Sequence, residues 1–181
     1  MRYGLLLLLL VLLAPWAGAQ DKPAALTEAQ VKALYVLNFT KYVEWPEAAF
    51  NGAKAPLVIG LVGRNSLDGD LKSIVQGKSV GGRTIEIRTL AVDEDASGCH
   101  ILFVGEHERR RAGEVLEKLA GRPVLTVGES ENFVEEGGVI RFQRKEGSIR
   151  LAINPQPAQK AGLKLSSKLL GVAEIVKGKG E

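Results

Sequence analysis

The sequence contains few of the residues with which small proteins bind metals or cross-link themselves. Its 181 residues include one cysteine, Cys99, and two histidines, His100 and His107. One cysteine excludes an intramolecular disulfide, so the fold must depend on its core, in which Cys99 is expected as a small buried apolar residue. The histidines bracket one predicted strand and so lie at its opposite ends. Because a metal ion needs convergent ligands, we expect no metal site.

Motifs of catalysis and nucleotide binding are also scarce. There is no S-x-x-K pair and no G-x-G-x-x-G loop. Gly77-Lys78-Ser79 resembles the end of a phosphate loop, but it follows a predicted helix, and Lys72 stands where that motif needs its first glycine. The carboxylates form no pair that stands out by spacing. We therefore expect a protein without enzymatic activity and without a cofactor.

The charge of the chain does not favour nucleic acid as a partner. Twenty-four basic and 21 acidic side chains give a formal net charge of +3. The densest basic run, Arg109–Arg111, is interspersed with glutamates on a predicted helix, which is typical of a solvated helix face. Nucleic-acid binding would need a segregated basic patch.

The first residues have the pattern of an export signal. Arg2 precedes the apolar run Leu5–Leu13, and Ala17-Gly18-Ala19 presents small residues for cleavage. The run is shorter than the roughly 20 residues that span a bilayer. We expect a cleaved signal peptide over 1–19, a flexible lead-in over 20–26, one domain over 27–176 and a tail over 177–181.

Strand and helix patterns alternate along the domain. Continuous apolar runs predict buried strands at Leu57–Val62 and Ile101–Val104. A strand is also expected at Thr84–Leu90, another at Val124–Val127, and a hairpin at 139–153. The predicted helices are 66–76, 108–120 and 163–176, besides one that ends at Trp45. This order predicts an α/β domain with a mainly parallel sheet, helices on both faces and a C-terminal antiparallel hairpin at one edge.

The helix expected between Thr27 and Trp45 has an unusually wide apolar face. Val31, Leu34, Tyr35, Asn38, Tyr42 and Trp45 share one side, which we assign to the core. Val36, Phe39 and Val43 extend it, interrupted only by Lys32, and are the candidates for a partner-binding patch. The alternative is that all three pack in the interior or in a homodimer. Asn38 is expected as a buried, hydrogen-bonded amide, with a ligand or partner contact as the alternative.

The carboxyl ends of the parallel strands are the other place for a site, because ligands bind there in open α/β sheets. The loop after Leu57–Val62 supplies Arg64, Asn65 and Ser66, where a helix start could bind an anion through its backbone. These three residues are the candidates for binding a small molecule.

Three stretches together resemble the YfiR family of small periplasmic proteins. They are VKALYVLNFTKYVEWP, CHILFVG with VLTVGES after it, and GGVIRF followed by IRLAINPQPAQKAGLKLSSKLL. They span nearly the whole mature chain in the family's order. The resemblance implies a compact α/β fold, a periplasmic location and no enzymatic activity.

The same resemblance implies a regulatory function. A characterised member binds the periplasmic domain of a membrane-anchored diguanylate cyclase and inhibits it, and an outer-membrane lipoprotein can sequester that inhibitor. On this basis we expect an inhibitor in cyclic-di-GMP and biofilm signalling, with a small-molecule sensor as the alternative. That member also has disulfides. This chain, with Cys99 alone, could form only an intermolecular bridge.

Overall fold

The computed structural model describes residues 25–63 and 65–178. The predicted signal peptide and residues 20–24 of the lead-in lie outside the described residues, and so does the end of the predicted tail, residues 179–181. Within the described ranges, no helix is both long and apolar enough to cross a membrane.

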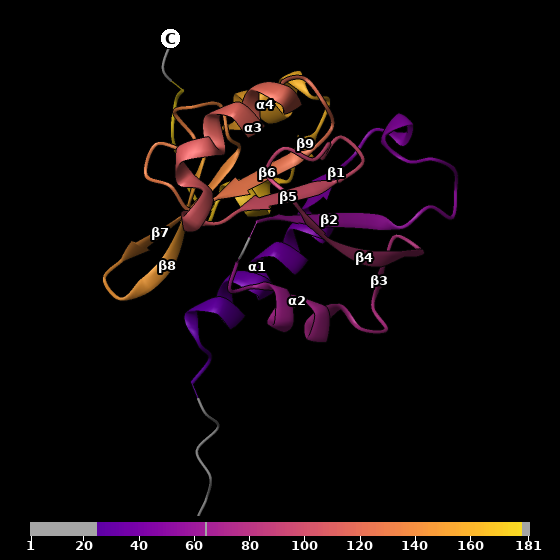
Figure 1. The fold of residues 1–181 in the computed structure, drawn as a ribbon, viewed down its shortest axis with the longest axis horizontal. Coiled ribbons are helices and arrows are strands. Elements are labelled where there is room, and N and C mark those ends of the chain that lie inside the picture. Colours follow the sequence, from indigo (N-terminus) through magenta and orange to yellow (C-terminus); the bar gives the residue numbers. More distant parts are fainter. Residues whose placement is uncertain (1–24, 64, 179–181) are drawn as a thin grey trace, which may run out of the picture.

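An eight-stranded sheet forms the centre of the domain (Figure 1). Its strands are β2 (Leu57–Val62), β3 (Ser79–Val80), β4 (Arg83–Leu90), β5 (Ile101–Val104), β6 (Leu125–Gly128), β7 (Ile140–Lys145), β8 (Ser148–Ile153) and β10 (Glu174–Ile175). Their order is β10-β8-β7-β6-β5-β2-β4-β3. The central run from β4 to β7 is parallel, whereas β3 and β8 are antiparallel to β4 and β7. The expected mainly parallel sheet with a late hairpin is confirmed.

Helices cover both faces of this sheet. One face carries α1 (Glu28–Tyr42) and α2 (Asp68–Val75), and the other carries α3 (Ala112–Leu119), which follows the 3-10 segment η2 (Glu106–Arg111). The larger apolar cluster lies on the α1 face and the smaller one on the α3 face. All six residues of β2 are buried, as its continuous apolar run predicts.

The start of α1 agrees with the sequence, but its end does not. Thr27 is the N-cap, and its side chain and that of Gln30 form a capping box. The helix stops at Tyr42 rather than Trp45, because the next residues are extended and form β1 (Val43–Glu44). This short strand pairs with β9 (Lys164–Leu165) in a separate two-stranded sheet.

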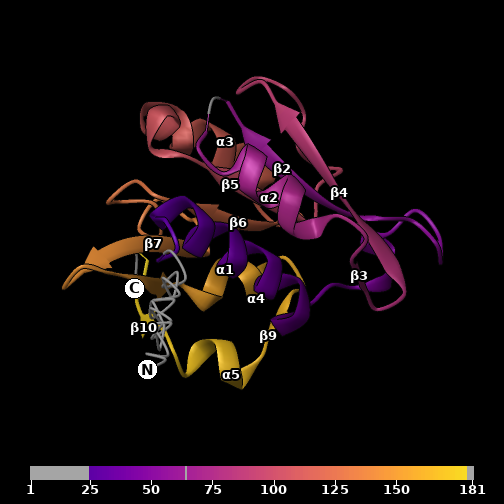
Figure 2. The ribbon, with the colours of Figure 1, turned by 90° about the horizontal axis from the view of Figure 1, so that it is seen from below.

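The long C-terminal helix expected over 163–176 is wrong. The region contains β9, the short helix α5 (Ser167–Leu170) and β10, after the earlier short helix α4 (Pro155–Lys160). Ser166 caps α5 by accepting a hydrogen bond from the N–H of Leu169, and the helix ends at Gly171. The shortened helix leaves α5 beside α1, as Figure 2 shows.

Candidate functional site

The orientation of α1 decides which of its residues reach the surface. Its buried residues are Ala33, Val36, Leu37, Phe39 and Thr40. The Phe39 ring packs against the rings of Tyr35 and Phe142, with centroids 6.3 and 6.2 Å away, and those two rings also contact each other at 5.9 Å. These stacking contacts fix the helix with Phe39 toward the sheet.

The prediction that Val36, Phe39 and Val43 form a partner-binding surface is therefore wrong. Val36 is 0% exposed, Phe39 1% and Val43 5%, so all three belong to the core in this conformation. The interpretation of Asn38 as a buried amide is also wrong, because Asn38 is exposed. The side of α1 that was predicted to face the core is therefore the outward side, because Asn38 and Tyr42 are exposed there.

A shallow hollow lies where this outward side of α1 meets α5. We call it the α1–α5 hollow, and its lining residues are Tyr35, Asn38, Phe39, Tyr42, Leu151, Lys168, Leu169 and Val172. Tyr42 is 37% exposed and Val172 68% exposed, and both are among the few large apolar side chains at the surface. Leu169 is buried beneath them. The hollow thus has an apolar floor and walls, with Asn38 and Lys168 as its polar groups.

A second, polar hollow lies at the carboxyl ends of the parallel strands, where a site was expected. We call it the strand-end hollow, and it is lined by Glu28, Lys32, Asn65, Ser66, Gly105, Glu106, His107, Glu129, Phe142 and Arg144. Two of the predicted ligand residues, Asn65 and Ser66, lie in it. The third, Arg64, falls outside the described residues.

An ion-pair network forms one wall of the strand-end hollow. The Lys32 Nζ lies 2.6 Å from a Glu28 oxygen and 2.5 Å from Oε1 of Glu129. The other Glu129 oxygen accepts a hydrogen bond of 2.8 Å from the N–H of Glu106. Arg144 pairs with Glu28 from the β7–β8 hairpin. The sequence analysis missed Lys32 and Arg144 as lining residues, although a lone lysine on an apolar helix face is a signal that could have identified Lys32.

Asn65 is the least satisfied polar group in this hollow. Its Oδ1 accepts a hydrogen bond of 3.0 Å from the N–H of Leu67, which shapes the turn into α2. Its Nδ2 is buried and has no hydrogen-bond partner among the described residues. A buried donor without an acceptor is uncommon and costly in a folded protein.

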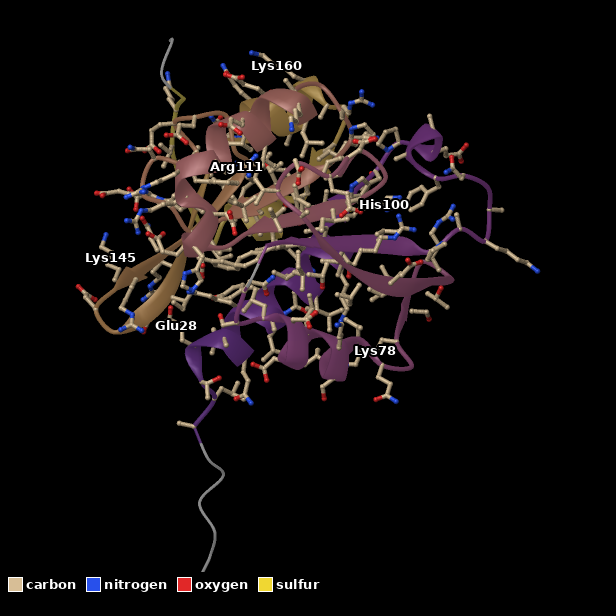
Figure 3. All side chains as sticks on the ribbon, viewed as in Figure 1. Glu28, Lys78, His100, Arg111, Lys145 and Lys160 are labelled. Carbon is tan, nitrogen blue, oxygen red and sulfur yellow. The ribbon has the colours of Figure 1, made fainter. Side chains whose placement is uncertain are left out.

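His100 lies at the opposite end of the sheet from Glu28, as Figure 3 shows. The imidazole ring of His100 stacks on the ring of Phe50, with centroids 4.3 Å apart. The guanidinium of Arg83 lies over the Phe50 ring, 3.8 Å from its centroid. Burial lowers the pKa of His100, and the charge of Arg83 lowers it further, while the backbone of Ala49 acts in the opposite direction. This arrangement attaches the loop after α1 to the start of β5.

Cys99 is buried next to His100. Burial raises the pKa of its thiol to about 11, so the sulfur is protonated and unreactive at neutral pH. The expectation of a small buried apolar residue is confirmed.

The described residues offer little chemistry for catalysis. They contain no group of histidine, cysteine and carboxylate side chains that could hold a metal ion. Gly77–Gly81 has the spacing of a G-x-S-x-G elbow, which the motif analysis overlooked, but its Ser79 opens the edge strand β3 and pairs with Thr84 in a hairpin. A nucleophile elbow is instead a sharp strand-to-helix turn.

The family follows from the sequence profile that the chain fits. The profile described as YfiR/HmsC-like matches residues 29–174, which is most of the chain and nearly all of the folded domain. The chain belongs to the YfiR/HmsC-like family. This family is one of periplasmic regulators in diguanylate cyclase signalling.

A solved structure supports the fold of this YfiR/HmsC-like chain. It is the crystal structure of a conserved domain protein from Vibrio cholerae O1 biovar eltor, with a TM-score of 0.58 and 14% sequence identity. The alignment covers 85% of this chain, which spans only 62% of that structure. At this identity the similarity concerns the arrangement of strands and helices alone.

Proposed function

We propose that this protein inhibits a membrane-anchored diguanylate cyclase by binding the cyclase's periplasmic domain through the α1–α5 hollow. The observation that carries the proposal is the exposure of Tyr42 and Val172 around a buried apolar floor. Aromatic and aliphatic side chains around a pocket, with a polar rim, are typical of the centre of a protein–protein interface.

The shape of the hollow suits one anchoring side chain of the partner. Its volume is about 230 Å³, which fits a single large apolar side chain better than a flat interface patch. Asn38 and Lys168 can donate hydrogen bonds to the main chain on either side of that anchor. An outer-membrane lipoprotein that inserted a similar side chain would compete with the cyclase and release it.

The test uses the purified protein with the full-length cyclase in lipid nanodiscs. Val172→Lys places a charge in the hollow, and Tyr42→Ala removes one wall. We expect each to weaken binding at least about tenfold, or about 1.4 kcal/mol, and to relieve inhibition of cyclic-di-GMP synthesis. Leu26→Lys is the matched control. Leu26 is 58% exposed, precedes the N-terminus of α1 and does not line the hollow.

The outcomes separate the partner from the surface. If the wild-type protein neither binds nor inhibits the cyclase, the proposed function is wrong. If it inhibits, but Val172→Lys and Tyr42→Ala inhibit equally well, the partner stands and the α1–α5 hollow is not its binding surface.

A second candidate function is sensing of a small polar molecule in the strand-end hollow by Asn65 and Ser66. The unpartnered Nδ2 of Asn65 favours it, because a ligand oxygen could satisfy this donor after a small side-chain movement. A thermal-shift screen with small carboxylates and sugars would detect saturable stabilisation. Asn65→Asp keeps the acceptor for Leu67 but removes the donor, so it should abolish the shift, whereas no ligand-induced shift in the wild type would contradict the idea.

A further inference from the structure

The outer edge of β4 is largely uncovered. β3 is the last strand of the sheet, but it pairs with β4 only at Ser79↔Thr84 and Val80↔Arg83. β4 itself continues to Leu90, so its residues 85–89 have no strand neighbour on that side among the described residues. Figure 2 shows β4 along the rim of the sheet, with β3 beside its first residues. An open edge of this kind can pair with another strand.

The hydrogen-bonding pattern shows which backbone groups face outward. The Leu90 carbonyl accepts a hydrogen bond from the N–H of Gly63, so Leu90 directs its backbone toward β2. Along a strand these directions alternate from residue to residue. The N–H and C=O groups of Ile85, Ile87 and Thr89 therefore point away from β2, into the open edge.

The side chains of β4 anchor the strand to the core on one face and carry charge on the other. Ile85 and Ile87 pack against the core cluster on the α1 face. Glu86 and Arg88 project from the opposite face, where their side chains are 44% and 48% exposed and the Arg88 Nε lies 2.8 Å from Oε1 of Glu86. The strand thus combines a rigid backbone with one negative and one positive side chain.

We propose that a second copy of this chain pairs with β4 through its own β4, antiparallel, with the two Ile87 residues opposite each other on a two-fold axis. The pairs are then Ile87 with Ile87, and Ile85 with Thr89 in both directions. All of them direct their N–H and C=O groups outward, so each pair exchanges two main-chain hydrogen bonds.

Charge selects this register over its neighbours. With Ile87 on the axis, Glu86 of each copy lies opposite Arg88 of the other, at a closely spaced pair without main-chain bonds. A shift of two residues in either direction would place Glu86 opposite Glu86 or Arg88 opposite Arg88. A shift of one residue would oppose backbone groups that point away from each other.

The length of the open edge agrees with the same register. β3 covers the strand up to Thr84, and β4 ends at Leu90. The uncovered stretch between them, 85–89, is centred on Ile87. Each copy therefore fills the open edge of the other and stops where β3 begins.

This surface is separate from the one assigned to the cyclase. The α1–α5 hollow involves α1, α5 and Leu151 of β8, and β8 lies far from β4 in the strand order. The dimer proposal therefore does not depend on the proposed function, and a dimer would carry two copies of the hollow.

The experiment measures the mass of the purified chain over a range of concentrations by sedimentation equilibrium. We expect a reversible dimer in the wild type. Glu86→Arg and Arg88→Glu each place two like-charge contacts across the axis and should raise the dimer dissociation constant at least about tenfold. Both side chains are almost half exposed, so both variants should fold. Arg111→Glu reverses an equally exposed charge on the α3 side and should leave the dissociation constant unchanged (Figure 3).

Mixing the variants gives the decisive result. The doubly positive Glu86→Arg chain and the doubly negative Arg88→Glu chain should form a heterodimer at least about tenfold tighter than either homodimer. The double variant E86R/R88E should dimerise like the wild type. A wild-type monomer at all concentrations overturns the proposal. So does a dimer that these charge reversals do not weaken, or one whose mixed variants fail to pair.

Discussion

The backbone N–H of Val58 donates a 3.0 Å hydrogen bond to Nδ1 of His100. This bond requires the imidazole to be neutral at Nδ1, because a protonated ring would turn a second donor toward the N–H. His100, which directly precedes β5, thus accepts the hydrogen bond from Val58 of β2 only while its ring is uncharged.

Acid should therefore destabilise the protein through His100. Its folded pKa lies below the ordinary value of 6.5, so the unfolded chain binds the proton more readily than the folded one. The stabilising contribution is complete above about pH 6.5 and is lost as the pH falls from there through the folded pKa. Urea unfolding between pH 5 and 8 should show this loss.

His100→Asn isolates the effect. The amide oxygen can accept the Val58 N–H without titrating, so the pH-dependent difference in unfolding free energy between wild type and variant reports His100 alone. His107→Gln, at the exposed second histidine, is the control and should follow the wild-type curve. Parallel curves for wild type and His100→Asn would contradict the assignment.

Phe133 lies between two glycines that have no room for a methyl group. A Cβ on Gly128 would lie 2.3 Å from the Phe133 ring, and one on Gly138 would lie equally close. Gly128→Ala should therefore cost about 1–3 kcal/mol in unfolding free energy, measured by denaturant titration. Combining it with Phe133→Leu should cost less than the sum, because the smaller side chain relieves the clash.

Gly69→Ala is the matched glycine substitution for that experiment. Nothing lies within 4 Å of a Cβ at Gly69, which is inside α2. This variant should be neutral or more stable by up to about 1 kcal/mol, owing to the better helix propensity of alanine. A loss similar to that of Gly128→Ala would mean that contact with Phe133 does not explain the cost of Gly128→Ala.

Phe39→Ala should unfold the protein more readily by about 3–5 kcal/mol, since the ring is 1% exposed and packs on Tyr35 and Phe142. Val172→Ser, on the exposed side chain of the α1–α5 hollow, should change stability by less than about 0.5 kcal/mol. Denaturant titration of both variants measures the difference. Equal effects would mean that the orientation of α1 is wrong.

The sequence predicted the strands better than the faces of the helices. β2 and β5 agree with their predicted bounds, because uninterrupted apolar runs between turns have few alternative interpretations. The helix α1 is apolar nearly all round, so periodicity alone could not choose its buried side. Contact with Phe142, more than a hundred residues later, made that choice.

The C-terminal region was mispredicted for a related reason. Leu165, Leu169 and Val172 repeat at helical spacing, although only Leu169 is buried and Val172 is exposed. Pairing of Leu165 with Val43 and of Glu174 with Ala152 replaced a continuous helix by short strands. Such pairings are tertiary contacts, which a local pattern does not encode.

The strand-end hollow was predictable in position but not in composition. Asn65 and Ser66 lie in the loop after β2, so the rule for open α/β sheets predicted their position. Lys32 and Arg144 reach the same hollow from α1 and β7, and only the folded structure shows that they lie there.

The contact between Lys32 and Glu129 provides the last prediction. Their side chains are only 13% and 16% exposed, so breaking the pair leaves a charge that water solvates poorly. Glu129→Gln should cost about 1–3 kcal/mol, less than for a fully buried pair, because Glu28 still pairs with Lys32. Lys72→Met, which breaks the exposed pair with Asp68, should cost less than about 0.5 kcal/mol.

A double-mutant cycle with Lys32→Met and Glu129→Gln separates the direct interaction from the loss of the Glu106 contact. Glu129 also accepts a hydrogen bond from that backbone N–H, and Lys32→Met leaves this bond in place. A coupling free energy of about 1 kcal/mol or more, measured by denaturant titration, would show that the ion pair joins α1 to the end of β6. Additive losses would instead assign the cost of Glu129→Gln to the Glu106 turn, and the wall of the strand-end hollow would then depend on that turn rather than on Lys32.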